Sequence, residues 1–458
     1  MTQGNVIWIR NPLATYGIDT NSGRPAQNVS GIIVSNGRIE CVLLQGEDWV
    51  GDYDEIIDAS RLVVLPGLIN THHHFYQTLT RAHPNAINKK LFPWLQTLYP
   101  IWAGLEPEGF RLAVRVALAE LLLSGCTTAS DHHYVFPRNL TDAVDIEVEE
   151  AEALGIRVHL TRGSMNLSVE DGGLPPKSVV QDRDTILADS ERVIRRFHDP
   201  TDGAMVRVAL APCSPFSVTP DIMIETAELA EKLDVRLHTH LSETEDENEF
   251  CQEMFGCRPV DYLEQQGWLL DRTWLAHGIH FNDDEIARLG AAGTGVAHCP
   301  SSNHLLASGR CHVRALEAAG APVGLAVDGS ASQDCSNLIQ EVRQAMYLQR
   351  LHSGAEAITH FDAFRWATEG SARCLGRTDI GTLQAGTQAD LALFSLDELR
   401  FSGAGDPLAA LVLCGAHRAD RVMVAGKWVV ENGIIPGLEI QELLQAHHSA
   451  AMTLQGLD

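Results

Sequence analysis

The sequence predicts an α/β protein: a closed (β/α)8 TIM barrel with a small β-sandwich domain formed by the N- and C-terminal segments. In the middle of the chain, short apolar runs of strand length alternate with segments of helical periodicity, which is typical of parallel βα units. Eight such runs occur there, the number that closes a barrel. A doubly wound open sheet is the alternative, but no GxGxxG or phosphate-binding loop supports a nucleotide site.

The two ends of the chain are rich in β-type segments. Val6–Arg10, Val29–Ser35 and Gly37–Leu44 read as strands, and Asn36-Gly37 between two apolar runs is a hairpin signal. A similar pattern returns near the C-terminus, where the strand-like segments are Asp390–Phe394 and Arg421–Val430. We therefore expect residues 1–65 and 381–458, the latter including a C-terminal helix, to build one β-sandwich beside a barrel of residues 66–380.

The expected barrel strands are Leu62–Asn70, Thr127–Asp131, Arg157–Thr161, Val206–Pro212, Val235–Leu241, Thr273–Ile279, Gly295–Cys299 and Val323–Asp328. The helical segments between them are Gly109–Ser124, Asp142–Leu154, Val179–Phe197, Asp221–Leu233, Asp246–Gln266, Asp283–Leu289 and Val313–Ala319. Two further helices, near Asn337–His352 and Phe361–Leu375, are expected after the eighth strand.

Composition limits the possible partners and location. The chain has 458 residues and a formal net charge of −26, which argues against nucleic acid and against anionic membrane surfaces. No apolar run approaches the roughly 20 residues that cross a bilayer, and the first twelve residues lack the pattern of a secretory signal. The ten cysteines are scattered without a CxxC pair, so we expect reduced thiols in a cytoplasmic protein.

Several of the 20 histidines form tight groups at the ends of the predicted strands, where a barrel carries its reactive groups. The first strand ends in His72-His73-His74. Side chains alternate along a strand, so His72 and His74 point the same way and can chelate zinc or iron. The alternative is a loop of histidines that form local hydrogen bonds.

Three more strand ends carry polar groups. The fifth contains His238 and His240, of which His240 lies nearer the C-terminal end, and Glu243 follows it. The sixth ends at His277 and the eighth at Asp328. Each has an ordinary alternative: a solvated helix start for Glu243, a buried structural imidazole for His277, and a turn cap for Asp328. Together, however, they place metal ligands and proton carriers at one face of the barrel.

These motifs resemble the amidohydrolase superfamily, specifically its deaminase branch. The resemblance covers nearly the whole chain and is carried by Pro66–His74, His240-x-x-Glu243, His277, Asp328-Gly329 and Gly381–Phe394. It implies that one divalent metal, zinc or alternatively iron, is held by His72, His74, His240 and Asp328. Many members bridge two metals with a modified lysine on strand 4, but here Leu210–Pro215 contains no lysine, which implies a single metal.

The resemblance also implies hydrolytic deamination. A water molecule on such a metal has a pKa of about 7. Asp328 is expected to accept its proton, Glu243 to carry a proton to the ring nitrogen, and His277 to steady the water or the developing oxygen charge. Three loops, His72–Ala82, Ser130–Pro137 and Ala211–Thr219, are similar to those of 8-oxoguanine deaminases, so conversion of 8-oxoguanine to urate is the expected reaction.

Other proteins with the same arrangement of motifs leave alternatives open. These are an s-triazine aminohydrolase of the hydroxyatrazine type, an adenosine-thioether deaminase, a hydrolase that opens a cyclic amide or imidazolone, or a zinc-stabilised scaffold without catalysis. The expected substrate is a small planar heterocycle, and a closed homo-oligomer is plausible. Candidate substrate contacts, each of which is alternatively an ordinary core or surface residue, are Gln77, Trp94, His132, His133, Cys213 and Asn303.

Overall fold

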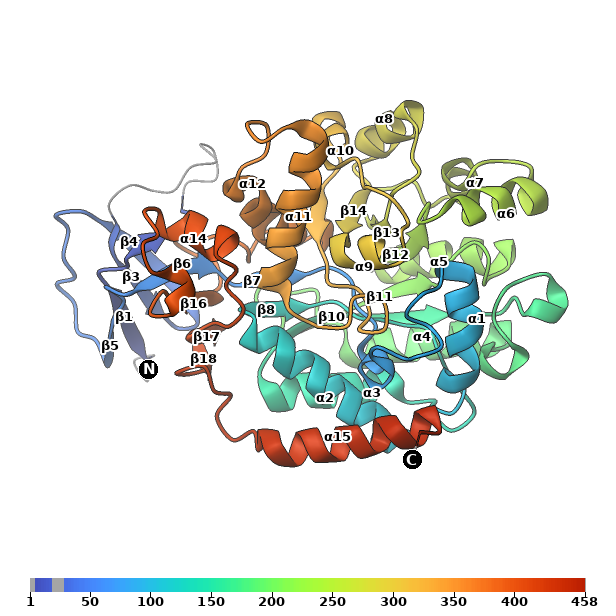
Figure 1. Ribbon diagram of the computed structural model, residues 1–458, viewed down its shortest axis with the longest axis horizontal. Coiled ribbons are helices and arrows are strands. Elements are labelled where there is room, and N and C mark those ends of the chain that lie inside the picture. The colour runs from blue at the N-terminus through green and yellow to red at the C-terminus, as the bar shows by residue number, and fades with distance from the viewer. Residues whose placement is uncertain (1–4, 19–28, 458) are drawn as a thin grey trace.

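The computed structural model describes residues 5–18 and 29–457. Residues 1–4, 19–28 and 458, which belong to the predicted terminal segments, lie outside the described residues, so the expectation about the first twelve residues falls partly outside them. Two small sheets lie side by side at one end of the molecule, and a barrel wrapped in helices forms the rest (Figure 1).

The barrel contains one parallel strand path that runs in chain order from β7 (Leu68–Asn70) to β15 (Val323–Leu325), with the short strand β9 off this path and paired with β10. Backbone hydrogen bonds from Thr71 N to Leu325 O (3.1 Å) and from Asp328 N to His72 O (3.1 Å) join its two ends. The predicted fold class is therefore confirmed. Its strands are β7 (Leu68–Asn70), β8 (Cys126–Ala129), the short β9 (His132–His133), β10 (Arg157–Ser164), β11 (Val206–Pro212), β12 (Leu237–Leu241), β13 (Thr273–His277), β14 (Gly295–His298) and β15 (Val323–Leu325).

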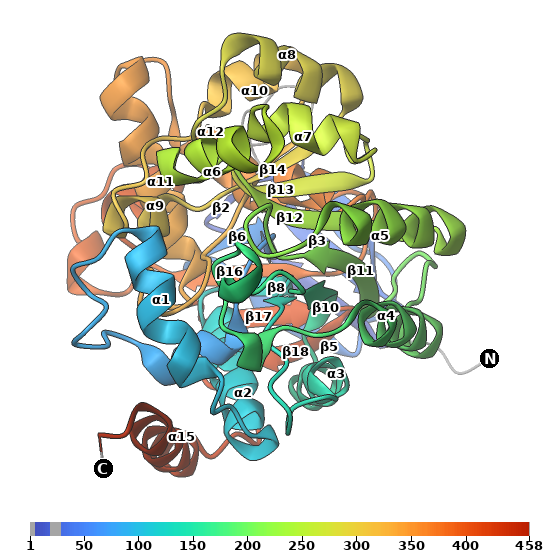
Figure 2. The same ribbon diagram turned by 90° about the vertical axis from the view of Figure 1, so that its right-hand side faces the viewer.

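The described residues form helices, most of which surround the barrel (Figure 2). They are α1 (Leu91–Trp102), α2 (Pro107–Leu123), α3 (Ala143–Leu154), α4 (Arg183–Phe197), α5 (Pro220–Leu233), α6 (Glu245–Phe255), α7 (Pro259–Gln265), α8 (Asp283–Ala292), α9 (Pro300–Leu305), α10 (Val313–Ala319), α11 (Leu338–Ser353), α12 (His360–Arg365), a π-helical turn η4 (Trp366–Gly370), α13 (Ser371–Cys374), α14 (Pro407–Leu413) and α15 (Ile440–Gln455). The short 3-10 turns are η1 (Phe75–Thr80), η2 (Val169–Asp171), η3 (Lys177–Val179) and η5 (Leu399–Phe401).

The apolar run Leu62–Asn70 forms two strands rather than the single strand expected. β6 (Leu62–Pro66) pairs antiparallel with β16 (Leu391–Ser395) of a small sheet, whereas β7 pairs with β8 of the barrel. The break is at Gly67, where a Cβ atom would lie 2.1 Å from Oγ1 of Thr127. Only glycine lets the backbone approach so closely while it changes sheets.

The two small sheets share one buried apolar cluster, with side chains such as Ile32, Val64 and Leu391 in it. Asn36 (φ 52°) and Gly37 (φ 78°) form the predicted tight hairpin between β3 and β4, because both residues adopt the left-handed conformation that such a turn needs. The first sheet contains β1 (Val6–Arg10), β3 (Val29–Ser35), β4 (Arg38–Leu44) and β5 (Glu55–Asp58). The second contains β2 (Ala14–Thr15), β6, β16, β17 (Arg421–Val424) and β18 (Lys427–Val430). The domain boundaries at 65 and 380 stay predictions.

Three helical segments differ from expectation. The predicted helix 246–266 is two helices, α6 and α7, because Gly256 (φ 71°) ends the first and Pro259 begins the second. α1 was not predicted as a helix, since Pro93 and Pro100 interrupt its apolar pattern. After β18 the chain returns along the barrel, so α15 packs on α2 and η1 and lies away from the small sheets (Figure 1).

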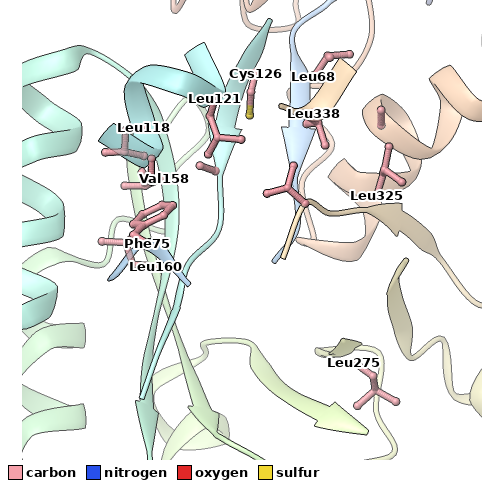
Figure 3. Close-up of a cluster of buried hydrophobic side chains, with 14 of the residues drawn as sticks. Leu68, Phe75, Leu118, Leu121, Cys126, Val158, Leu160, Leu275, Leu325 and Leu338 are labelled. Carbon is pink, nitrogen blue, oxygen red and sulfur yellow. The ribbon is translucent and has the colours of Figure 1, made fainter. Parts of the chain in front are cut away.

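The hydrophobic core lies between the barrel strands and their helices. Figure 3 shows part of it, where Leu118 and Leu121 of α2 approach Val158 of β10 and Cys126 of β8. All four side chains are inaccessible to solvent. Burial on this scale holds the strand ends, and so the site they carry, in fixed positions. Among the described residues, no helix has the length and apolar character required to cross a bilayer.

Candidate active site

Four side chains from three separate parts of the barrel meet at the C-terminal ends of the strands. Nε2 of His72 and Nε2 of His74 each lie 3.3 Å from Oδ1 of Asp328, and Nε2 of His240 lies 3.2 Å from Nε2 of His74. His72 and His74 follow β7, His240 lies in β12 and Asp328 follows β15. All four are at least nine-tenths buried.

These separations fit a metal. Ligand atoms about 2.0–2.1 Å from a tetrahedral zinc ion are about 3.3 Å apart, which matches the spacing found here. In addition, Nε2 of His72 is buried without a hydrogen-bond partner among the described residues. A shared cation accounts for both observations, because an unpartnered buried nitrogen otherwise carries a desolvation cost of about 1–3 kcal/mol.

The hydrogen bonds on the far side of His74 and His240 decide where their lone pairs point. Nδ1 of His74 lies 2.8 Å from the carbonyl oxygen of His132, and Nδ1 of His240 lies 2.7 Å from that of Cys213. A carbonyl oxygen only accepts, so each Nδ1 carries the hydrogen and donates it. Each Nε2 then presents a lone pair, and a cation between them relieves the repulsion of lone pairs 3.2 Å apart.

His72 is oriented by a longer chain of contacts. Nδ1 of His238 donates to the carbonyl oxygen of Trp274 (2.8 Å), so a neutral His238 has its lone pair on Nε2. That atom lies 2.8 Å from Nδ1 of His72 and accepts its hydrogen. Nε2 of His72 is thereby left with a lone pair as well. The two histidines of β12 therefore have different roles, with His240 at the cluster and His238 behind it.

Glu243 and His277 lie beside the four-residue cluster. Nε2 of His277 is 3.4 Å from Oε2 of Glu243 and 3.9 Å from Oδ2 of Asp328. Burial, together with the negative charge of Asp328, raises the pKa of Glu243 well above its usual value, so its carboxyl group holds a proton more readily than a free glutamate does. Burial lowers the pKa of His277 to about 4, so its imidazole is neutral. A carboxyl group with a raised pKa and a neutral imidazole therefore adjoin the cluster.

Asp328 stays ionised in the same surroundings. Burial raises the pKa of this carboxyl group, but the adjacent imidazoles of His72, His277 and His74 outweigh burial and lower the pKa well below its usual range. The backbone is strained here: Asp328 has φ 65° and His277 has φ 73°, although neither is glycine. Such conformations cost of order 1–3 kcal/mol and are found where function requires them.

A cavity opens above this cluster. Its floor is formed by His74, His240, Glu243, His277 and Asp328, and α1 supplies much of one wall. The remaining lining residues are Gln77, Leu91, Trp94, Leu95, Tyr99, Tyr134, Cys213, Phe216, Leu306 and Ser332. Apolar and aromatic walls over a polar floor are suited to a flat ring that reacts at one edge.

Three predicted substrate contacts line this cavity. Gln77 accepts a hydrogen bond from Ala331 N through Oε1 (3.3 Å), and Nε1 of Trp94 donates to Ala331 O (3.2 Å). Both side chains are therefore anchored to the loop after β15. Cys213 lies beside His240, and burial raises the pKa of its thiol to about 12, which leaves it without nucleophilic character at neutral pH.

Three other predicted contacts do not belong to the described residues that line the cavity. His132 lies beneath the cluster, where its Nε2 donates to Ala211 O (2.9 Å). His133 points the opposite way, because side chains alternate along β9, and packs against Phe110 and Phe136. Asn303 lies behind His277, with its Nδ2 3.1 Å from Nδ1 of His277.

Sequence reasoning missed much of the cavity wall. Leu91, Leu95 and Tyr99 recur at the spacing of one helix face, which is a detectable signal once the two prolines of α1 are set aside. Ser332 donates to Oδ2 of Asp328 (3.2 Å) and follows it by four residues, so proximity in the chain was the available signal. Phe216 lies in a loop and had no signal of its own.

Comparison with known proteins agrees with this geometry. Residues 63–429 match the amidohydrolase family. The chain is 62% identical to 8-oxoguanine deaminase of Pseudomonas aeruginosa over 98% of both chains, and 40% identical to hydroxydechloroatrazine ethylaminohydrolase of a Pseudomonas species over 86% of this chain and 83% of the other. An atrazine chlorohydrolase of Arthrobacter aurescens, solved in complex with zinc, superimposes with a TM-score of 0.92 at 32% identity, covering 97% of this chain and 100% of that one. The chain belongs to the amidohydrolase family.

Proposed function

We propose that this protein is a metal-dependent hydrolytic deaminase that converts 8-oxoguanine and water to urate and ammonia. The observation that carries the proposal is the 62% identity to 8-oxoguanine deaminase over 98% of both chains. The geometry supports the reaction class, because a carboxyl group with a raised pKa, a carboxylate and a neutral imidazole adjoin three converging imidazole lone pairs at the floor of a cavity.

His72, His74, His240 and Asp328 would hold one divalent metal, and three imidazoles with one carboxylate suit zinc, with iron(II) as the alternative. When bound, such a metal lowers the pKa of water and so supplies a nucleophile at neutral pH. The zinc in the related atrazine chlorohydrolase structure supports this choice of metal. The absence of a lysine in Leu210–Pro215 supports a single ion.

The protein's side chains handle the protons. Asp328, held ionised, would accept the proton from the attacking water. Glu243, whose raised pKa favours the carboxylic acid, would donate to the ring nitrogen next to the carbon that bears the amino group, which makes that carbon more electrophilic. The neutral His277 would donate a hydrogen bond to the oxygen that develops charge. Asp328 would pass the proton taken from the water to the amino group, which leaves as ammonia, and Glu243 would regain a proton from the hydroxyl group on the ring carbon as the carbonyl forms.

The cavity walls favour a planar ring. Trp94, Tyr99 and Phe216 provide flat apolar surface, and the amide of Gln77 can meet the lactam edge of an oxopurine. Deamination at C2 requires that carbon to lie over the floor, near Glu243 and Asp328. Arg81, the cation close to the metal motif, forms an ion pair with Glu120. Its charge is therefore already balanced and gives no reason to expect an anionic substrate.

One assay tests the proposal. Metal-replete protein is incubated with 8-oxoguanine, guanine, isoguanine, pterins, hydroxytriazines and adenosine thioethers, and ammonia is measured. We expect activity on 8-oxoguanine, and we expect Glu243→Gln to lower kcat by about 10²–10⁴-fold while metal content stays constant. Near-full ammonia release by that variant would contradict the role of Glu243. Activity confined to triazines or thioethers would contradict the substrate.

The second candidate is an s-triazine aminohydrolase, which the 40% identity to hydroxydechloroatrazine ethylaminohydrolase favours. It would release an alkylamine instead of ammonia, so the same incubation distinguishes the two when both amines are measured. A homo-oligomeric state and a cytoplasmic location stay predictions.

A further inference from the structure

We propose that Asn303 is a positioning residue that fixes the tautomer of His277, so that His277 presents Nε2–H to the reacting atoms. The inference rests on the proposed function and assigns Asn303 to it, although Asn303 is not among the described residues that line the cavity. Among the described residues, Asn303 reaches the site through its hydrogen bond to His277.

The first step is the contact between the two side chains. Nδ2 of Asn303 lies 3.1 Å from Nδ1 of His277, and both residues are about 99% buried. An amide nitrogen donates and does not accept, so Nδ1 of His277 must be the acceptor. A neutral imidazole with its lone pair on Nδ1 carries its hydrogen on Nε2.

The opposite side of the imidazole leads to the same tautomer. Nε2 of His277 faces Oε2 of Glu243 at 3.4 Å and Oδ2 of Asp328 at 3.9 Å. A lone pair on Nε2 would face these two carboxyl oxygens, which is unfavourable, whereas an N–H is attracted to them. If the amide of Asn303 were reversed, its oxygen would face Nδ1, and Nδ1 would have to carry the hydrogen. The lone pair would then be on Nε2, where it makes that unfavourable contact. The two sides of the ring therefore agree.

The backbone around Asn303 holds the amide in place. Asn303 lies in the short helix α9, where its N–H donates to Cys299 O (3.1 Å) and its carbonyl oxygen accepts from Ser308 N (2.9 Å). Its Oδ1 is buried and has no hydrogen-bond partner among the described residues.

A fixed Nε2–H limits what His277 can do. It can donate a hydrogen bond to the attacking water or to the oxygen that develops negative charge, but it has no lone pair there to remove a proton. Proton removal is then left to Asp328. By fixing this tautomer, Asn303 keeps His277 as a hydrogen-bond donor and leaves Asp328 as the base.

The test combines NMR with kinetics. In the metal-replete wild-type protein, imidazole ¹⁵N spectra, assigned by the signal that is lost in His277→Gln, should show an unprotonated Nδ1 and a protonated Nε2. Asn303→Asp replaces the donor by an acceptor of the same shape and should move the proton to Nδ1. Asn303→Leu removes the hydrogen bond altogether. We expect both variants to lower kcat by about 10–100-fold, the usual cost of losing such a supporting contact, with KM within about threefold and metal content unchanged.

His304→Gln, an exposed position on the same helix, is the matched control and should change none of these quantities. The inference is overturned if the wild-type spectrum shows a protonated Nδ1, or if both Asn303 variants keep kcat within about twofold. If one variant does not fold, the other variant and the wild-type spectrum still decide the matter. Absence of ammonia from every substrate would overturn the proposed function instead, while the spectrum would still report the tautomer.

Discussion

Glu247 holds the backbone of Glu243: its Oε2 accepts a hydrogen bond from Glu243 N at 3.0 Å, and its Oε1 accepts one from Ser242 N at 2.8 Å. Burial raises the pKa of Glu247 to about 7, while these two N–H groups oppose the shift. A single carboxylate thus fixes the turn from β12 into α6, where Ser242 adopts the left-handed φ of 54°. The position of the Glu243 side chain depends on this turn.

We expect Glu247→Gln to lower kcat by about tenfold or more. Glutamine keeps one acceptor, but its NH2 group faces an N–H donor, so one hydrogen bond is replaced by a repulsive contact. Metal content should remain at the wild-type level, because Glu247 touches none of the four proposed ligands. Steady-state kinetics and elemental analysis measure both quantities.

Glu249→Gln, which is exposed on the same helix, is the control and should behave as wild type. Loss of metal together with activity in Glu247→Gln would show that the turn supports His240 rather than Glu243.

The site illustrates which features a sequence can reveal. His72, His74, His240, Glu243 and Asp328 could be placed together because strand ends of one barrel share a face and side chains alternate. Asn303 was expected at the substrate, yet its contact is with His277, 26 residues earlier in the chain. That pairing depends on how α9 packs, which no local pattern encodes.

Prediction of the fold from the sequence had the same limit, because local patterns do not encode tertiary contacts. Barrel strands such as Val206–Pro212 could be read from apolar runs, because residues 208–212 are apolar and buried on both faces of the sheet. The break of Leu62–Asn70 could not, since both halves are apolar and differ only in which strand each one pairs with. The hydrogen-bonding partner of a strand is a tertiary property.

We expect His238→Phe to weaken metal binding by about 10–100-fold, the usual cost of losing such a supporting contact. The substitution retains a flat ring that can stack on Trp274, as His238 does at 4.3 Å between ring centres. It leaves Nδ1–H of His72 without its acceptor, so His72 is no longer held with its Nε2 lone pair toward the cluster. Titration of zinc against a competing chelator measures the change.

His159→Phe provides a matched control, because His159 is also buried beside Trp274 but contacts no proposed ligand. An unchanged zinc affinity in His238→Phe would contradict the orienting role of His238.

Gly329→Ala is expected to raise KM for 8-oxoguanine about tenfold while the metal stays bound. A Cβ atom at position 329 would lie 2.0 Å from Oε1 of Gln77, so the end of the glutamine side chain must move. Glutamine is flexible enough to do so without unfolding the protein, but its amide then leaves the cavity wall. Gln77→Ala should produce a similar KM, and the double variant should add little to either change. Additive effects in the double variant would show that Gly329 acts by another route.

Stability should fall with rising pH through Glu341, which is buried and accepts a hydrogen bond from Ser301 N (3.1 Å) at the start of α9. Burial raises the pKa of this carboxyl group to about 8 in the folded protein, against about 4.3 in the unfolded chain. Between these values the unfolded chain releases the proton and the folded protein keeps it, so the folded state loses stability as pH rises. Glu341→Gln resembles the protonated group and does not lose this stability. The Tm of the variant minus the Tm of the wild type should therefore increase by a few degrees between pH 5 and pH 8. Thermal unfolding measured across that range, with the exposed Glu356→Gln as a control, tests this, and a constant Tm difference would contradict it.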